Sequence, residues 1–449
     1  MKLPQDPILA MLAPAGQALL ARAGAAPVLP PECSRRDSVT PSSRGPHHGR
    51  FRTAAARRMT VRRRHVIYVP GYDPRGVAHY YRMFRHELGR FRTLHGLRTE
   101  VSRPTSPPDA AFSTWIVTTH GPGWQVETTY ELMRWDDVVR ADAGRPIWRR
   151  IGAAWLLLAR YLFTGALARI AWAHWRFGLF FLYPYITLLA IALAAALAGT
   201  AVAALFAGLL GASPPLALAL LPTTIGAGLA LAVMVAILRL SESRTYLLYL
   251  FDDGTSTDAY ARRCRPDWEA RLALFAERVV AVAQAAAADE IVVVGHSSGS
   301  FMAVDVLAQA LARDPALGGH GPTVSLVTMG ANLPLVGFNR AGGWFVERLA
   351  QVLAAPNLAW LDLQSRKDVM CFCPFNQAAG HGLAGPMLTT VRVRFRDGLL
   401  PQSYAAFRWQ FFRVHFQYLM ANERPAAWDY FMMICGPRSL AQVAASLRR

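Results

Sequence analysis

The longest stretch without charge places the first limit on what this chain can fold into. No Asp, Glu, Lys or Arg occurs in the 62 residues from Phe177 to Leu238. About 20 apolar residues suffice to cross the hydrocarbon layer of a membrane, and helices of soluble proteins are seldom apolar all round. Because Pro214 and Pro215 divide the stretch, the sequence predicts two transmembrane helices, at about 182–210 and 216–238, joined by a short loop at 211–215.

The segment before this stretch favours the membrane surface. Residues 147–176 are apolar but interrupted by several Arg residues, and four Trp residues lie among them. Trp and Arg together are typical of the lipid headgroup layer. We therefore expect an interfacial segment, with a third span as the alternative if the Arg160 side chain extends to the headgroups.

The composition agrees with a membrane protein that has a basic cytoplasmic side. Hydrophobic residues make up 53% of the chain. It contains 48 Lys and Arg and 29 Asp and Glu, which gives a formal net charge of +19. No recognised nucleic-acid-binding motif accompanies this charge, so we expect no nucleic-acid partner. The five cysteines form no C-x-x-C pair, which indicates reduced thiols, no metal site and no cofactor.

A strand, a sharp turn and a helix follow one another in the second half of the chain. Ile291–Val294 is a run of β-branched residues, typical of a strand buried on both faces, and Phe301–Leu311 is apolar at helical spacing. Between them stands a G-x-S-x-G motif, Gly295-His296-Ser297-Ser298-Gly299.

The spacing of this motif has a steric reason. A serine that stands exposed in so tight a turn needs residues without bulk two positions before and two positions after it. Gly295 and Gly299 meet this need around Ser297, whereas Ser298 lacks such neighbours. The Ser298 amide begins the following helix, where backbone N–H groups stabilise an oxyanion.

In this strand–motif–helix context the chain resembles the α/β-hydrolase superfamily. The resemblance covers roughly residues 64–118 and 246–430 and implies a mostly parallel α/β sheet interrupted by the two-helix transmembrane insertion. The expected organisation has four parts: a disordered N-terminal tail at 1–58, a first part of the hydrolase domain at 59–146, the interfacial segment and hairpin at 147–240, and a second part with the nucleophile elbow at 241–449.

The alternation of apolar patterns predicts the remaining elements. Strands are expected at 65–69, 114–119, 125–132, 246–251, 323–329, 358–363 and 389–395. Helices are expected at 79–97, 267–288, 343–354 and 403–422, with a turn at 252–256.

The resemblance also implies an oxyanion hole. In this superfamily a strand followed by a Gly-containing turn supplies one of the two N–H groups. The strand at 65–69 is followed by Gly71 and Tyr72. The implied oxyanion hole is the pair of N–H groups of Tyr72 and Ser298, with Gly71 beside them.

The resemblance further implies a catalytic triad in the order Ser, acid, His. After Ser297, Asp368 lies in a loop just past a strand, and Asp362, inside that strand, is the weaker candidate. His415 follows the last predicted strand and is the expected base. The alternative base is His381, in the glycine-containing loop Ala379–Leu383.

The sequence thus predicts a membrane-anchored serine hydrolase that cleaves an acyl ester, with a lipid or another apolar compound as the natural substrate. An acyltransferase with the same triad is the alternative within this chemistry, and a non-catalytic membrane scaffold is the alternative outside it. Both flanks of the hairpin must join one sheet, and Arg residues surround the spans while the loop is uncharged. We therefore expect a bacterial inner-membrane protein with a cytoplasmic catalytic domain.

Overall fold

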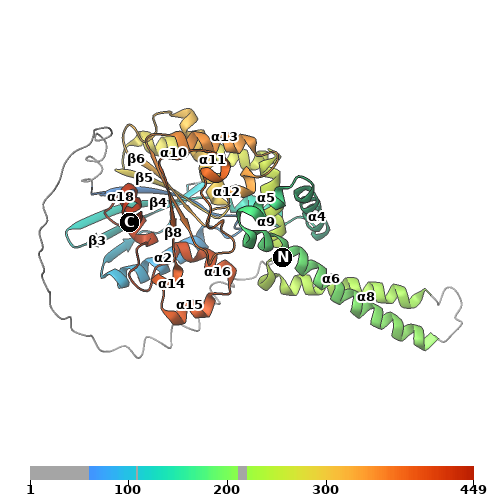
Figure 1. Ribbon diagram of the computed structural model, residues 1–449. Helices are drawn as coiled ribbons and strands as arrows, with labels where there is room; N and C mark the ends of the chain where they lie inside the picture. Colours follow the sequence, from blue (N-terminus) through green and yellow to red (C-terminus); the bar gives the residue numbers. More distant parts are fainter. Residues whose placement is uncertain (1–59, 108–109, 211–219, 449) are drawn as a thin grey trace, which may run out of the picture. The chain divides into compact units, whose positions relative to one another are not determined.

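A single sheet forms the centre of the protein. The computed structural model describes residues 60–107, 110–210 and 220–448, so the predicted tail at 1–58 and the hairpin loop at 211–215 lie outside the described residues. Within the described ranges the sheet has eight strands in the order β2-β3-β4-β1-β5-β6-β7-β8 (Figure 1). The strands are β1 Arg63–Val69, β2 Arg98–Val101, β3 Phe112–Gly121, β4 Trp124–Met133, β5 Glu290–His296, β6 Thr323–Met329, β7 Leu358–Gln364 and β8 Leu388–Arg392.

The sheet is mostly parallel, as predicted. Strand β1 pairs in parallel with both β4 and β5, and the parallel pairing continues to β8. The β2–β3 and β3–β4 pairs are the antiparallel ones among these strands. Val69 lies opposite Gly295 in the register of β1 and β5. The loops that follow these two strands therefore meet at one edge of the sheet, where parallel α/β proteins place their ligands.

Helices cover both faces of the sheet (Figure 1). One layer is formed by α10 Pro266–Ala285, α11 Gly299–Arg313, α12 Leu333–Gly337 and α13 Gly343–Ala354. The short helix η2 Ala379–His381 lies on this side as well, since Ala378 belongs to the same cluster. The opposite layer is formed by α2 Val77–His95, α17 Tyr430–Cys435 and α18 Leu440–Leu447 with shorter elements, which are α14 Phe395–Gly398, α15 Pro401–Phe407, α16 Phe411–Phe416 and η3 Gln417–Leu419. The remaining helices near the membrane segment are α3 Asp136–Ala143, α4 Ile147–Phe163, α5 Ala166–Ala173, α6 Trp175–Leu210, α8 Leu221–Thr245 and α9 Leu247–Ala261.

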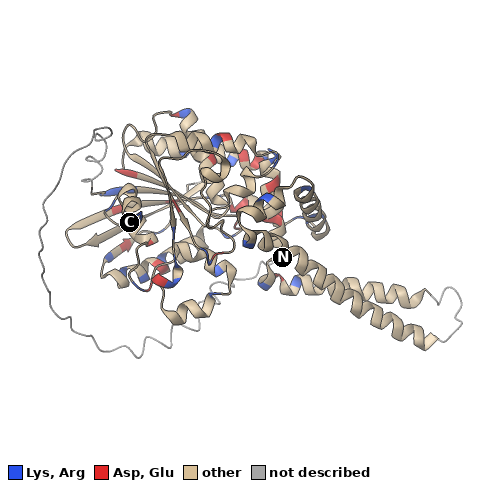
Figure 2. Ribbon diagram, in the orientation of Figure 1, with Lys and Arg blue, Asp and Glu red and all other residues tan. Residues whose placement is uncertain are grey.

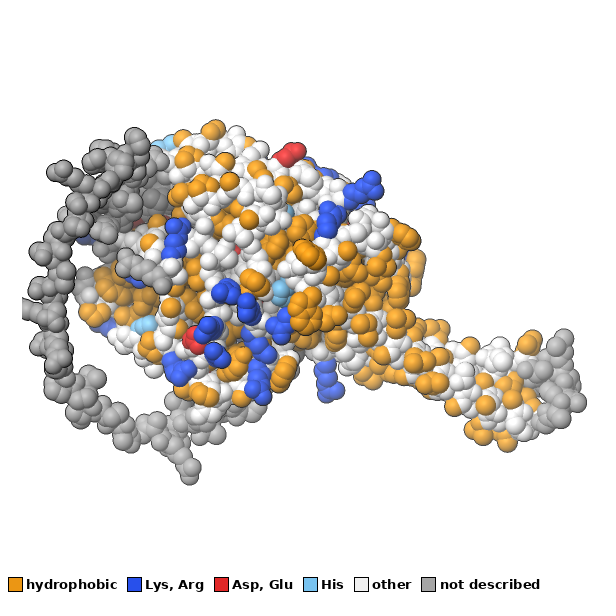
Figure 3. All heavy atoms as spheres, in the orientation of Figure 1, with side chains coloured by type: hydrophobic (Ala, Val, Ile, Leu, Met, Phe, Trp, Pro, Cys, Tyr) orange, Lys and Arg blue, Asp and Glu red, His pale blue; other side chains and the backbone are white. Residues whose placement is uncertain are grey.

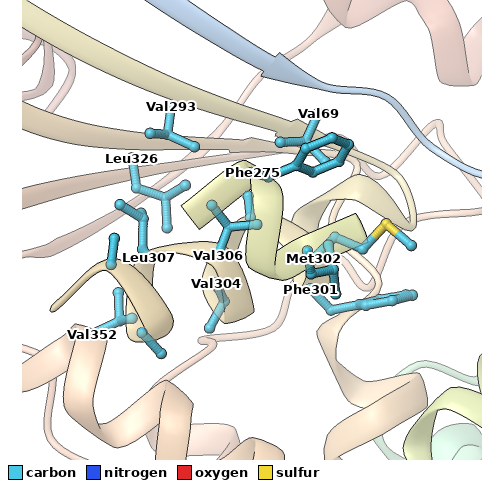
Figure 4. Packing of buried hydrophobic residues seen from close by; sticks show 14 of the residues in the cluster. Val69, Phe275, Val293, Phe301, Met302, Val304, Val306, Leu307, Leu326 and Val352 are labelled. Atoms are coloured by element: carbon cyan, nitrogen blue, oxygen red, sulfur yellow. The ribbon is translucent and has the colours of Figure 1, made fainter. Parts of the chain in front are cut away.

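Strand β5 shows why its sequence is apolar throughout. Ile291 and Val293 pack in the cluster with α10 and α11, whereas Val292 and Val294 pack in the cluster on the opposite face. Figure 4 shows Val293 and its neighbours from the sheet and the helices in the first of these clusters. Since each such side chain contributes about 1.5–3 kcal/mol when fully buried, the strand that carries the motif is held firmly from both sides.

Two sequence predictions about local structure were wrong. Residues 246–251 and 252–256 do not form a strand and a turn. Tyr246 is the N-cap of helix α9 and residues 247–256 belong to this helix, in which Leu247 and Phe251 are buried one helical turn apart. The acidic residues of this helix are accommodated because Asp252 is paired with Arg150 at 2.9 Å. The predicted helix at 403–422 is divided into α15, α16 and η3.

The segment 147–176 folds as two helices that meet at an angle. Helices α4 and α5 enclose a bend of 78°, where Gly165 has a φ of +69°. The Arg160 side chain binds Asp258 of α9, so it turns toward the protein and not toward headgroups. Two aromatic side chains of this segment are almost fully exposed: Trp172 is 94% and Phe163 is 91% exposed.

Two helices are long and apolar enough to cross a membrane. They are α6, with 36 residues, and α8, with 25 residues, and both extend beyond the predicted spans toward the body of the protein. Figure 2 shows that the paired helices are almost free of charge, apart from a few Lys or Arg side chains near the base. A Cβ on Gly199 would lie 2.4 Å from the Gly226 oxygen, so these glycines permit the close contact between the two helices.

Candidate active site

Ser297 lies in a strained turn between β5 and α11. Its φ is +57°, a conformation that residues other than glycine seldom adopt. A Cβ on Gly295 would lie 2.6 Å from the Gly299 oxygen, and one on Gly299 would lie 2.1 Å from the Val69 oxygen. Both positions therefore have no room for a side chain because the backbone approaches closely, which is the steric reason that the sequence analysis gave for the two glycines.

The turn after β1 lies directly beside Ser297. A Cβ on Gly71 would lie 2.9 Å from the Ser297 Cβ and 3.3 Å from its Oγ. The next residue, Tyr72, is held in place because its hydroxyl donates to Asp142 at 2.9 Å. The structure thus brings Gly71 and Tyr72 to the nucleophile candidate, as the resemblance implied.

Two backbone N–H groups at this edge of the sheet are available to a ligand. Within the described ranges, no residue accepts a hydrogen bond from the Tyr72 amide or from the Ser298 amide. The Ser298 amide stands at the N-terminus of α11, where the helix dipole favours negative charge. The Ser298 hydroxyl is not free to react, because it is fully buried and donates to Asp253 at 3.2 Å.

His415 and Asp368 form a buried pair. The Nδ1 atom of His415 lies 2.7 Å from Oδ2 of Asp368, and the other carboxylate oxygen accepts the Met370 N–H at 3.0 Å. The second ring nitrogen of His415, Nε2, is buried and has no hydrogen-bond partner among the described residues. This arrangement orients an imidazole with one nitrogen open to accept a proton.

The position of His415 relative to the motif follows from its neighbours. The His415 carbonyl lies 3.0 Å from Nε2 of His296, and the two rings are 4.6 Å apart. A Cβ on Gly330, after β6, would lie 2.8 Å from Cε1 of His415. The imidazole therefore packs on the ends of β5 and β6, next to the turn that carries Ser297.

The other predicted candidates lie in different surroundings. His381 binds the Gln377 carbonyl at 2.8 Å and contacts Phe338 and Phe375, with no carboxylate bonded to it in the described structure. Burial lowers the pKa of His381. Asp362 is engaged within the sheet, where it accepts the Thr328 hydroxyl at 2.7 Å. The acid–base pair that the structure assembles is Asp368 with His415.

Asn332 is a site residue that the sequence analysis missed. Its amide lies 3.4 Å from Ser297 Oγ. The surrounding hydrogen bonds assign its nitrogen to the Met370 carbonyl, at 2.7 Å, so its oxygen faces the serine hydroxyl. Ser297 Oγ has this contact in place of a hydrogen bond to His415, and catalytic hydrogen bonds are often long before substrate binds.

Asp253 is a second missed residue. Burial raises its pKa to about 7, although its hydrogen bond from Ser298 and the nearby His415 act in the opposite direction. His296, by contrast, has a pKa lowered well below its usual value by burial and by His415. His296 therefore stays neutral and does not compete with His415 for a proton.

The site shows no sign of a metal centre in the described residues, where no group of three or more His, Cys, Asp or Glu could hold an ion. Comparison of the chain with protein-family models, with curated proteins and with solved structures found no match.

Proposed function

We propose that this chain is a serine hydrolase of the α/β-hydrolase type that cleaves carboxylic esters at a membrane. The observation that carries the proposal is the combination of Ser297 in a left-handed turn with the buried pair of His415 and Asp368 beside it. A buried imidazole with an open nitrogen and an oriented second nitrogen is what a serine hydroxyl needs for activation.

The reaction follows from these positions. His415 Nε2 accepts the proton of Ser297 as the hydroxyl attacks the ester carbonyl, and Asp368 stabilises the imidazolium through Nδ1. The negative charge on the carbonyl oxygen is held by the N–H groups of Tyr72 and Ser298. The imidazolium then donates its proton to the leaving alcohol, and water repeats the sequence to release the acid.

In the structure the Ser297 hydroxyl contacts Asn332 and not His415, so the serine side chain has to move slightly before it attacks. A turn of the Ser297 side chain away from Asn332 would bring its Oγ toward His415. The Gly71 position must lack a side chain, because a Cβ there would lie 2.9 Å from the Ser297 Cβ.

The proposed location is an inner membrane with the catalytic body in the cytoplasm. Strand β1 precedes the hairpin and β5 follows it, yet the two pair directly, so an even number of spans separates them. Arg239 and Arg244 follow the second span, and positively charged residues favour the cytoplasmic side. A reporter cysteine at Ser213, in a cysteine-free background, should react with an impermeant thiol reagent on intact cells, whereas one at Gly319 should not.

The activity is tested with purified protein and p-nitrophenyl acetate. Ser297→Ala and His415→Ala should each lower kcat by about 10⁴-fold or more, whereas His381→Ala, the matched histidine control, should stay within a few-fold of wild type. Equal loss in the two histidine variants, or a Ser297→Ala protein with wild-type turnover, would reject the proposed triad.

A further inference from the structure

An apolar cavity lies between the membrane hairpin and the candidate site. It is bounded by helices α4, α6, α9 and α12, and its lining is almost entirely apolar or aromatic. The side chains that the argument uses are Tyr161, Phe177, Phe181, Tyr185, Leu250 and Leu335. Asp253 is the only charged residue that lines it.

Three lining residues of the cavity connect it to the candidate site. Asp253 accepts a hydrogen bond from Ser298 at 3.2 Å. Leu335 belongs to α12, which begins directly after Asn332, the residue in contact with Ser297. Phe177 stacks on Phe372, with ring centroids 4.3 Å apart, in the loop that carries Asp368. The lining of the cavity therefore adjoins the segments that carry Ser298, Asn332 and Asp368.

The outer end of the cavity lies at the level of the membrane surface. Helix α6 is about 54 Å long at 1.5 Å per residue, whereas the hydrocarbon layer is about 30 Å thick. A Cβ on Gly199 would meet Gly226 and Ala230, and a Cβ on Gly226 would meet Gly199 and Ala203. Later residues of α6 thus lie beside earlier residues of α8, so the two helices run antiparallel and Arg239 lies near the turn that begins at Ile186. The cavity residues of α6, from Phe177 to Tyr185, thus come immediately before the charge-free part of the hairpin.

The surface around this end is also suited to lipid. Figure 3 shows hydrophobic side chains gathered on the side of the body from which the hairpin emerges. Trp155, Leu156 and Trp175 are among the exposed apolar residues of α4 and α6 there. Aromatic residues at the base of a membrane hairpin are typical of the membrane interface. A molecule in the hydrocarbon layer therefore enters the cavity without crossing water.

The dimensions and polarity of the cavity select the occupant. Its volume is about 50 Å³, well below the roughly 150 Å³ of an apolar cavity that holds benzene, so the occupant is slim. The raised pKa of Asp253, about 7, reduces the charge that an apolar occupant would face. A short length of linear hydrocarbon chain fits these conditions and a ring does not.

We infer that this cavity binds the acyl chain of the substrate and admits it from the bilayer, so that the substrate is an ester of a linear fatty acid dissolved in the membrane. The inference rests on the proposed function, because it assumes that Ser297 attacks the ester carbonyl. The chain lies between α6 and α9, with its carbonyl end at Ser297 and its methyl end toward the hairpin.

The test compares fluorophosphonates with ethyl, hexyl and decyl chains on the full-length protein in lipid nanodiscs. The rate constant of inactivation should rise by about fourfold for each methylene buried in the cavity, as expected from about 0.8 kcal/mol per methylene. Leu335→Trp, which fills the inner end, should remove this rise, so that its rate constants for the ethyl, hexyl and decyl probes lie within a few-fold of one another. Leu193→Trp, on the lipid-facing side of α6, is the matched control and should keep the wild-type profile.

The outcomes separate the two proposals. If Ser297 reacts with the ethyl probe but the wild-type rates do not depend on chain length, the cavity is not the acyl site and only this inference fails. If Leu335→Trp reacts with none of the probes, Leu335→Ala decides. Its wider cavity should accept a branched-chain probe faster than wild type does, and the absence of such a gain overturns the inference. If no probe reacts with Ser297, the proposed function fails and this inference fails with it.

Discussion

Replacing Asp368 by Asn tests the role of the buried pair with the smallest change of shape. In the structure one oxygen of Asp368 accepts the Met370 N–H at 3.0 Å and the other faces His415 Nδ1 at 2.7 Å. An Asn side chain that keeps the first bond must turn its NH₂ group toward Nδ1. That nitrogen then has to act as the acceptor, so the proton moves to Nε2 and His415 no longer accepts the proton of Ser297.

The magnitude follows from this change of tautomer. An imidazole held in the wrong tautomer by an Asp-to-Asn change in a serine triad lowers kcat by about 10⁴-fold, which corresponds to about 5.5 kcal/mol in activation free energy. Folding should be affected far less, because Asn has nearly the same volume as Asp and can keep the hydrogen bond from the Met370 N–H.

The assay is steady-state hydrolysis of p-nitrophenyl butyrate, together with thermal unfolding in detergent to confirm the folded fraction. Asp362→Asn is the matched control, because Asp362 is also fully buried and lies six residues earlier in the same strand-and-loop segment. Its kcat per folded molecule should stay within about tenfold of wild type. A loss of less than tenfold in Asp368→Asn, or equal losses in both variants, would refute the tautomer argument.

Three further perturbations have expected outcomes. Gly71→Ala should lower kcat by about 10²-fold, because its Cβ would lie 2.9 Å from the nucleophile's Cβ, whereas Gly89→Ala, with open space around it, should leave kcat unchanged in the same esterase assay. Gly199→Leu should destabilise the helix pair by about 1–3 kcal/mol in thermal unfolding. Gly208→Leu should not, because a Cβ there would have no described atom within 4 Å. The folded pKa of Asp253, about 7, exceeds that of an unfolded Asp, about 3.9, so the wild type loses stability as pH rises from about 4 to 7. Asp253→Asn lacks this loss and should therefore be more stable than the wild type by a margin that grows over this range. Unfolding curves at about pH 5 and pH 8 measure the difference.

The elbow and the hairpin could be predicted because their signals are local. A β-branched run, two glycines at fixed distances from Ser297, and an apolar helix pattern describe the turn within a few residues. The hairpin depends on composition alone, and both long helices occur where the charge-free stretch predicted them. The sequence order of Asp368 and His415 came from resemblance, and the structure places the two side chains together.

Asp253 and Asn332 could not be found in this way, for reasons that involve tertiary contacts. Residues 246–256 lack a clear helical pattern because their acidic side chains are compensated by partners distant in sequence, such as Arg150 for Asp252. A strand and a turn were therefore predicted where α9 forms. The sequence did contain one indication of Asn332. It follows a predicted strand of a parallel sheet, at the edge where such sheets place their ligands.

The most direct test of the central claim is to identify the atom that a fluorophosphonate modifies. The full-length protein in nanodiscs is treated with the ethyl probe, digested, and analysed by tandem mass spectrometry. The account predicts a single adduct on Ser297, absent from Ser297→Ala and strongly slowed in His415→Ala. An adduct on Ser298 or Ser300, or one that persists in Ser297→Ala at the wild-type rate, would contradict it.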